Sequence, residues 1–140
     1  MQEMKLLGYE VEADLPLTRR WYARSEVWGC QCGHCRNFLE AVRKKRLPRD
    51  VTGLLDALKI PAEKATYVGQ LYTDSEGVHY QFSYRIAGNI VKAPDENTEW
   101  GRCCREPYPY GAPDFPEPHF DLEFWITLPW LLEEDGGGTR

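Results

Sequence analysis

Hydrophobic and polar residues alternate with a period of two along several stretches of the chain, and this spacing predicts β-strands. The clearest stretch is 78–86, and the turn residues 74–77 before it predict a β-hairpin with a strand over 66–73. One sheet face is expected to be the more buried one, and it carries Val78, Tyr80, Phe82, Tyr84 and Ile86. The other face carries His79, Gln81, Ser83 and Arg85. Further strands are expected over 8–15, over 20–28 from a weaker alternation, over 90–92 after a turn at Gly88 and Asn89, and over 120–128.

Between residues 33 and 61 the apolar spacing changes to that of an α-helix. Apolar side chains recur three and four residues apart and predict a helix over about 33–46, at Cys35, Phe38, Leu39 and Val42. Pro48 suits the first turn of a second helix, and Pro61 ends it. Together these patterns predict an α+β fold, an antiparallel twisted β-sheet with a two-helix insert after the first strands.

The length of 140 residues, with 42% hydrophobic and 28% charged residues, is typical of one globular domain. That α+β domain is expected to span residues 5–132, and the glycine-rich residues 133–140 are expected to be a disordered tail. Residues 93–119 hold six of the ten prolines and predict a long loop. No apolar run has the length of a membrane helix or a signal peptide, so we expect a cytoplasmic protein with reduced thiols.

Charge is unevenly distributed along the chain, whose net charge is −5. Residues 19–49 carry nine basic residues against Glu26 and Glu40, which gives +7 and leaves −12 for the remainder. An acidic protein with one basic segment does not have the usual charge pattern of a nucleic-acid-binding protein. We expect this segment to be a solvated helix face that pairs with the acidic remainder, and it is also suited to a phosphate or an acidic partner.

Five cysteines carry the most reactive chemistry of the chain. They form two groups in the sequence, Cys30, Cys32 and Cys35 in the first and Cys103 and Cys104 in the second. A Cys-x-x-Cys turn with a glycine inside it lets two thiolates point at one ion, and Zn²⁺ prefers four thiolate or imidazole ligands in a tetrahedron. The sequence therefore predicts a structural zinc site made by the first group and closed by one cysteine of the second.

Other interpretations of the same residues remain open. His34 and His119 are alternative fourth ligands for the zinc. Buried thiols also pack as small hydrophobic side chains without any metal. His119 lies between Glu117 and Asp121, a trio that suits a cation, although an ordinary surface position is the expected one.

Residues 32–35 read Cys-Gly-His-Cys, and this tetrapeptide resembles the active site of protein disulfide isomerases. A helix is expected to follow it, and a helix N-terminus with a nearby histidine lowers a cysteine pKa and makes the thiolate reactive. The likeness implies thiol–disulfide exchange at Cys32 and Cys35 as an alternative activity. The sequence departs from that family at Gln31, where an aromatic residue is expected, and in the order of its strands and helices.

A broader resemblance covers residues 28–132. The motif CxCxxCRNF at 30–38, the segment LPRDVTGLLDALKIPAEKA at 47–65 and the segment LEFWITLPWLL at 122–132 are similar to a group of small uncharacterised bacterial proteins. This resemblance implies the same architecture and no particular activity. We therefore expect a small zinc-binding accessory module rather than an enzyme, with a protein or small-molecule partner and with no role for a membrane or a nucleic acid.

Overall fold

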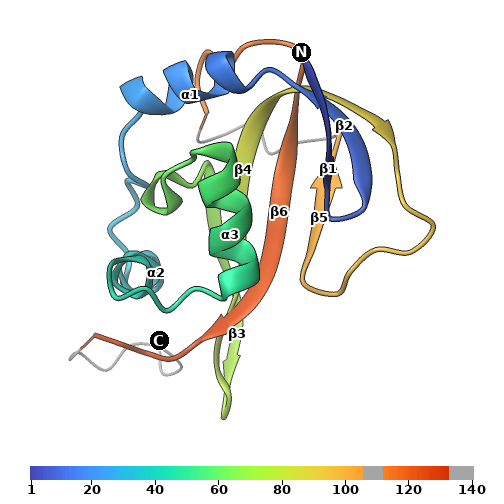
Figure 1. The fold of residues 1–140 in the computed structure, drawn as a ribbon. Helices are drawn as coiled ribbons and strands as arrows, with labels where there is room; N and C mark the ends of the chain where they lie inside the picture. Colours follow the sequence, from blue (N-terminus) through green and yellow to red (C-terminus); the bar gives the residue numbers. More distant parts are fainter. Residues whose placement is uncertain (106–111, 133–140) are drawn as a thin grey trace.

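An antiparallel sheet forms the centre of the computed structural model, which describes residues 1–105 and 112–132. Its strands follow the order β1-β2-β4-β6-β5, and β3 pairs with the half of the β4 edge that β2 leaves open (Figure 1). The strands are β1 (Gln2–Leu6), β2 (Tyr9–Ala13), β3 (Tyr67–Asp74), β4 (Gly77–Lys92), β5 (Gly101–Cys104) and β6 (His119–Leu128). With three α-helices in the described residues, this sheet confirms the predicted α+β fold.

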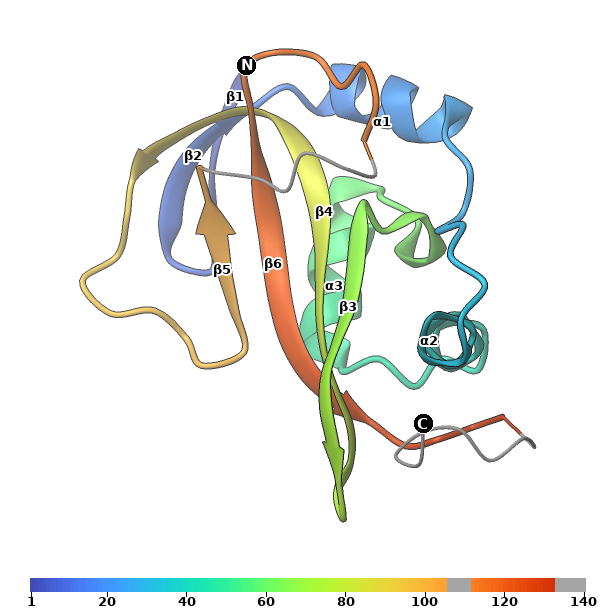
Figure 2. The same cartoon turned by 180° about the vertical axis from the view of Figure 1, so that it is seen from behind.

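Two of the helices match the apolar spacing of the sequence. They are α2 (Gly33–Arg43) and α3 (Arg49–Leu58), followed by the short 3₁₀ turn Ala62–Lys64. Phe38 of α2 packs on Phe82 of β4 with ring centroids 4.9 Å apart. Seen from behind, α3 lies behind β4, on the far face of the sheet (Figure 2). The insert therefore covers one face of the sheet, as the hydrophobic pattern requires.

The strand expected over 20–28 is wrong, because this region contains helix α1 (Leu15–Arg24). The Asp14 side chain accepts a hydrogen bond from the backbone N–H of Leu17 at 3.1 Å, and Pro16 occupies the first turn. Leu15, Thr18 and Tyr22 are buried at helical spacing. The adjacent aromatic residues in this helix resemble a strand in the sequence, whereas the capping signal at Asp14 indicates the helix that forms.

β4 continues without a turn through Gly88 and Asn89, so the expected turn at this position is wrong. Gly88 has a φ of 141°, and a Cβ placed there would collide with the carbonyl oxygen of Glu12. The glycine is therefore needed for the close approach of β2, which pairs with β4 through Ala13↔Gly88 and Val11↔Ile90. A glycine in a bent strand and a glycine in a turn produce the same sequence signal.

The predicted hairpin register is confirmed. Val78, Tyr80, Phe82, Tyr84 and Ile86 are each at most 1% exposed. Ser83 and Arg85 on the opposite face are buried as well, which the alternation did not indicate. Strands β1 and β5 were also missed, because β1 has little alternation and β5 is a four-residue strand inside the proline-rich region. The expected tail, residues 133–140, lies outside the described residues.

Candidate metal centre

Cys30, Cys32 and Cys35 come together immediately before and within the first turn of α2. Their three sulfur atoms all lie within 4.8 Å of one another. Cys30 and Cys32 are exposed to solvent, whereas Cys35 is buried. The cluster is therefore anchored from inside the protein by one thiol and open to solvent at the other two.

Local backbone structure positions the two thiols of the Cys-x-x-Cys turn. Cys32 is the N-cap of α2, and its sulfur accepts a hydrogen bond from the backbone N–H of Cys35 at 3.4 Å. The guanidinium Nε of Arg36 donates to the carbonyl of Gln31 at 3.1 Å, which fastens the preceding loop to the helix. The positive end of the helix dipole faces the cluster and favours negative charge there, as thiolates or a metal–thiolate group would provide.

The cysteine sulfurs differ in their electrostatic environment. Burial raises the pKa of the Cys35 thiol well above its ordinary value, although the indole N–H of Trp28 donates to this sulfur at 3.1 Å and opposes the shift. The pKa of Cys30 is lowered, first by the backbone N–H of Cys32 and then by the Cys35 thiol, which both donate to its sulfur. At neutral pH the buried thiol therefore holds its proton more tightly than the exposed one.

Cys103 and Cys104 do not join this cluster. They lie in β5, where they pair with Leu122 and Asp121 of β6. β5 is separated from β3, the strand next to α2, by β6 and β4, which amounts to roughly 14 Å at the usual strand spacing. Cys103 is buried, its thiol points to the carbonyl of Leu6 at 3.9 Å, and burial raises its pKa to about 12. The prediction that Cys103 or Cys104 provides the fourth ligand of the metal site is therefore wrong.

Neither alternative histidine ligand belongs to the cluster. His34 lies on α2, and its ring meets the ring of Trp130 edge to face at a centroid distance of 6.0 Å. His119 lies at the start of β6, where its Nε2 is 3.1 Å from a carboxylate oxygen of Glu117. Within the described residues, three cysteines form this group and no fourth Cys, His, Asp or Glu lies within the same 4.8 Å.

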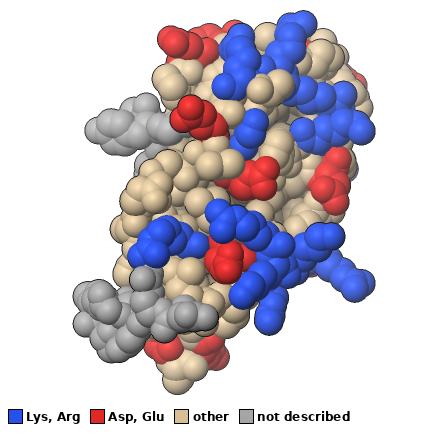
Figure 3. Space-filling view, turned by 90° about the vertical axis from the view of Figure 1, so that its left-hand side faces the viewer, with Lys and Arg blue, Asp and Glu red and all other residues tan. Residues whose placement is uncertain are grey.

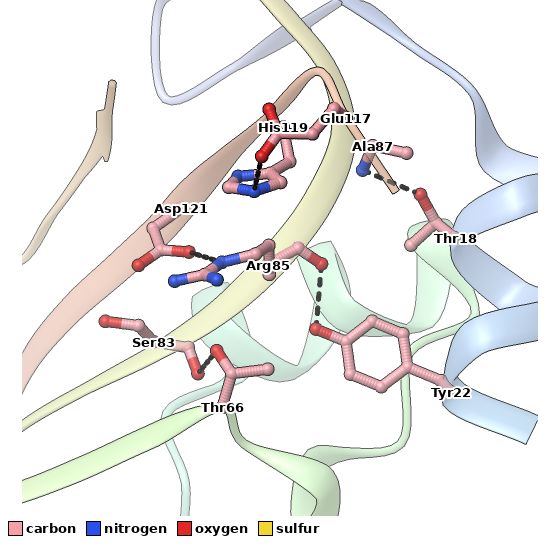
Figure 4. Close-up of polar contacts among 9 residues, drawn as sticks. All are labelled: Thr18, Tyr22, Thr66, Ser83, Arg85, Ala87, Glu117, His119 and Asp121. Carbon is pink, nitrogen blue, oxygen red and sulfur yellow. Dashed lines mark hydrogen bonds and ion pairs between the residues drawn. The ribbon is translucent and has the colours of Figure 1, made fainter. Parts of the chain in front are cut away.

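The suggested cation trio at His119 is also not assembled. Asp121 instead forms a buried ion pair with Arg85, with Nε and Oδ1 3.0 Å apart (Figure 4). The hydroxyl of Tyr22 donates to the carbonyl of Arg85 at 2.8 Å, which ties helix α1 to this part of β4. Tyr22, Arg85 and Asp121 thus connect α1, β4 and β6. The alternation of apolar and polar residues in the two strands did not indicate that Arg85 and Asp121 are buried.

A second group with metal-binding side chains occurs at the tip of the β3–β4 hairpin, where Asp74, Glu76 and His79 lie within 4.8 Å. Both ring nitrogens of His79 already have partners, the carboxylate of Asp74 at 2.9 Å and the hydroxyl of Thr127 at 2.9 Å. The pKa of Asp74 is lowered, first by its hydrogen bond with His79 and then by the backbone N–H of Glu76. A metal would have to displace these contacts, so this group is a weaker candidate than the cysteine cluster.

Comparison of the chain with protein-family models, with curated proteins and with solved structures gives no match. Across residues 1–105 and 112–132, the helices are all too short or too polar to cross a membrane. The cysteine cluster can hold a metal ion, because its three sulfur atoms lie within reach of a single ion.

Proposed function

We propose that this chain is a zinc-binding module in which Cys30, Cys32 and Cys35 hold the ion. The observation that carries this proposal is the convergence of three sulfur atoms within 4.8 Å. Four ligands at the usual Zn–S distance of about 2.3 Å lie about 3.8 Å from one another in a tetrahedron. The three sulfur atoms, all within 4.8 Å of one another, lie close to that spacing. Thiolate ligands also favour Zn²⁺ or Cu(I) over harder ions.

A bound ion would act first on the local structure. The segment from Trp28 to Cys32 has no regular secondary structure, and a metal bridging Cys30 to Cys35 would fasten it to α2. Because free energy of metal binding becomes free energy of folding, the ion would stabilise this part of the molecule. The described residues supply three ligands, so the fourth position is available to water or to a ligand from a partner. This arrangement suits an accessory module that binds a protein or a small molecule.

The test uses the 140-residue chain, purified under reducing conditions and loaded with Zn²⁺ or Co²⁺. We expect about one ion per chain by elemental analysis, and sulfur-to-cobalt charge-transfer absorption in the Co²⁺ form. Cys30→Ser and Cys35→Ser should each abolish tight binding. Cys104→Ser is the matched control, because it removes a partly exposed thiol outside the cluster. Unchanged metal content in Cys35→Ser, or its loss in Cys104→Ser, would refute the proposal.

Thiol–disulfide exchange is the second candidate function, and the asymmetry of the Cys-x-x-Cys turn favours it. Cys32 is exposed at the N-terminus of α2, while Cys35 is buried behind it. An exposed thiol can attack a disulfide substrate, and a second thiol within reach can then resolve the mixed disulfide. Oxidation of the metal-free protein should form a disulfide within 30–35, detectable by peptide mass analysis. Oxidation that leaves these three thiols intact would exclude this function.

A further inference from the structure

The cysteine cluster opens into a cleft on the face formed by α1, the linker 25–29 and α2. Two hollows of about 720 and 930 Å³ lie along this linker, and residues 25–29 line both. Cys30 lines the larger hollow, together with the apolar side chains of Val27, Trp28 and Leu39. Val27 is 48% exposed, so part of this apolar wall is accessible from solvent. A small molecule in this hollow would lie against the Cys30 thiol.

Basic side chains surround this cleft. On this face of the molecule, Lys and Arg gather in an upper group over α1 and a lower group around α2, with a few acidic residues between them (Figure 3). Arg36, Arg43 and Lys64 line the larger hollow, against Glu26 and Glu40. Glu40 is already paired with Arg43 at 3.3 Å and with Lys44 at 3.6 Å. The two hollows together are lined by four basic side chains (Arg24, Arg36, Arg43 and Lys64) and three acidic ones (Glu26, Glu40 and Asp114), so their lining carries a small excess of positive charge.

One cation is fixed at the boundary of the two hollows. The ammonium group of Lys64 donates to the carbonyl of Tyr22 at 2.7 Å, and Lys64 lines both hollows. A neutral carbonyl holds the ammonium group in place without cancelling its charge. A carboxylate of a ligand whose sulfur lies at Cys30 would therefore find a positioned positive charge in the same cleft.

From this arrangement we propose that the cleft selects anionic disulfides, those of small thiols that carry carboxylates, and presents them to Cys30. The proposal rests on the thiol–disulfide exchange described above and names its class of substrate. It places the first attack at Cys30 rather than at Cys32, because Cys30 is the cysteine that lines the larger hollow. The apolar wall at Trp28 and Leu39 accommodates the carbon chain of the ligand, and the basic rim accommodates its carboxylates. Cationic disulfides are disfavoured by the same charges.

The chemistry balances within the cluster. The Cys30 thiolate attacks one sulfur of the substrate disulfide, the substrate S–S bond breaks, and the first thiol leaves as a thiolate that takes a proton from water. A thiolate of Cys32 or Cys35 then attacks the sulfur of Cys30 and releases the second thiol. Two electrons pass from the protein dithiol to the substrate, which ends as two thiols, while the protein keeps one new disulfide.

The experiment compares three disulfides of different charge on the metal-free, reduced chain. Oxidised glutathione is the anionic probe, hydroxyethyl disulfide the neutral one and cystamine the cationic one. Mass analysis follows the mixed disulfide on Cys30 in a Cys32→Ser/Cys35→Ser variant, with each rate divided by that of a small free thiol with the same disulfide. We expect oxidised glutathione to be favoured over cystamine by at least about tenfold at low salt, and this preference to shrink at about 1 M salt.

Two charge variants decide whether the cleft causes the preference. Arg43→Gln/Lys64→Gln should reduce it severalfold, whereas Lys5→Gln/Lys92→Gln should not, although it changes the net charge of the chain equally. Equal rates for all three probes would overturn charge selection while leaving exchange intact. A Cys30 thiol that forms no mixed disulfide with any probe would overturn this proposal, whereas exchange at Cys32 and Cys35 is decided separately by the oxidation of the unsubstituted chain. A preference reduced equally by the control pair would overturn the role of this cleft and assign the effect to net charge.

Discussion

At the scale of single residues, Asn37 connects the cysteine-bearing helix to the end of the last strand. It is fully buried in α2, and its amide donates to the carbonyl of Pro129 at 3.1 Å. Its Oδ1 accepts a hydrogen bond from the backbone N–H of Leu131 at 2.6 Å. One side chain thus satisfies two backbone groups beyond β6 and fixes the orientation of the helix that carries Cys35.

We therefore expect Asn37→Ala to lower the free energy of unfolding by about 2–3 kcal/mol, because the backbone groups of Pro129 and Leu131 lose their partner. Urea unfolding of the metal-free protein measures this change. Asn89→Ala, at an exposed position of β4, is the control and should stay within about 0.5 kcal/mol of the unsubstituted chain. A loss of similar size in both variants would contradict this role for Asn37.

At the scale of elements, two glycines show how differently the same residue type serves a strand and a helix. Gly88 allows β2 to approach β4, and a side chain there would collide with the backbone of Glu12. Gly53 lies in the exposed middle of α3, where an added Cβ would meet no neighbouring atom within 4 Å outside its own helix. The first position requires glycine, and the second does not.

Gly88→Ala should destabilise the protein by about 2 kcal/mol or more, since it combines an unfavourable φ with a backbone collision. Gly53→Ala should stabilise it by about 0.5–1 kcal/mol, because alanine loses less backbone entropy in a helix. Thermal unfolding of the two variants side by side measures both signs. Melting temperatures that shift in the same direction would contradict this difference between the two glycines.

The ion pair that joins β4 to β6 acts at the same scale. The Arg85 and Asp121 side chains are 5% and 1% exposed, so removal of one leaves the other charged and buried. Asp121→Ala should cost about 3–5 kcal/mol, and the apolar double variant Arg85→Met/Asp121→Leu should cost clearly less. Denaturant unfolding of both variants provides the comparison. If the double variant were as unstable as Asp121→Ala, the loss of stability would not come from leaving Arg85 charged and unpaired, and this explanation would be wrong.

At the scale of the whole molecule, the cluster connects metal binding to pH. Each ligand thiol must lose its proton to bind an ion, and the raised pKa of Cys35 means that this thiol is protonated at neutral pH. The metal therefore displaces protons on binding, and its affinity must rise as the pH rises toward the thiol pKa values and fall in acid. Because the pKa of Cys30 is lowered, this thiol contributes less than Cys35 to the pH dependence of the metal affinity.

We expect the affinity for Co²⁺ to increase at least about a hundredfold between about pH 6 and pH 8, the consequence of one or more protons displaced per ion. Spectroscopic titration at several pH values across this range measures the slope. In Cys35→Ser, residual weak binding should show a shallower slope, because the thiol that holds its proton most tightly is gone. An affinity independent of pH would exclude thiolate ligation by these cysteines.

The sequence by itself determined the elements with strong local patterns. The register of β4, the apolar stripe of α2 and the Cys-x-x-Cys turn that caps it all depend on residues a few positions apart, and the structure confirms them. Cys30, Cys32 and Cys35 converge for the same reason, because a segment of six residues leading into a helix has little conformational freedom.

Only the tertiary structure decided the features that depend on strand order. The distance between α2 and β5 does not follow from any local sequence pattern. Cys103 or Cys104 was therefore expected to close the cluster, whereas β4 and β6 lie between β5 and the strand beside α2. The burial of Arg85 with Asp121 likewise follows from the pairing of β4 with β6, residues 36 apart in the chain. The cleft beside Cys30 forms where α1, the linker 25–29 and α2 come together. The spacing of apolar residues within one element does not predict how separate elements pack.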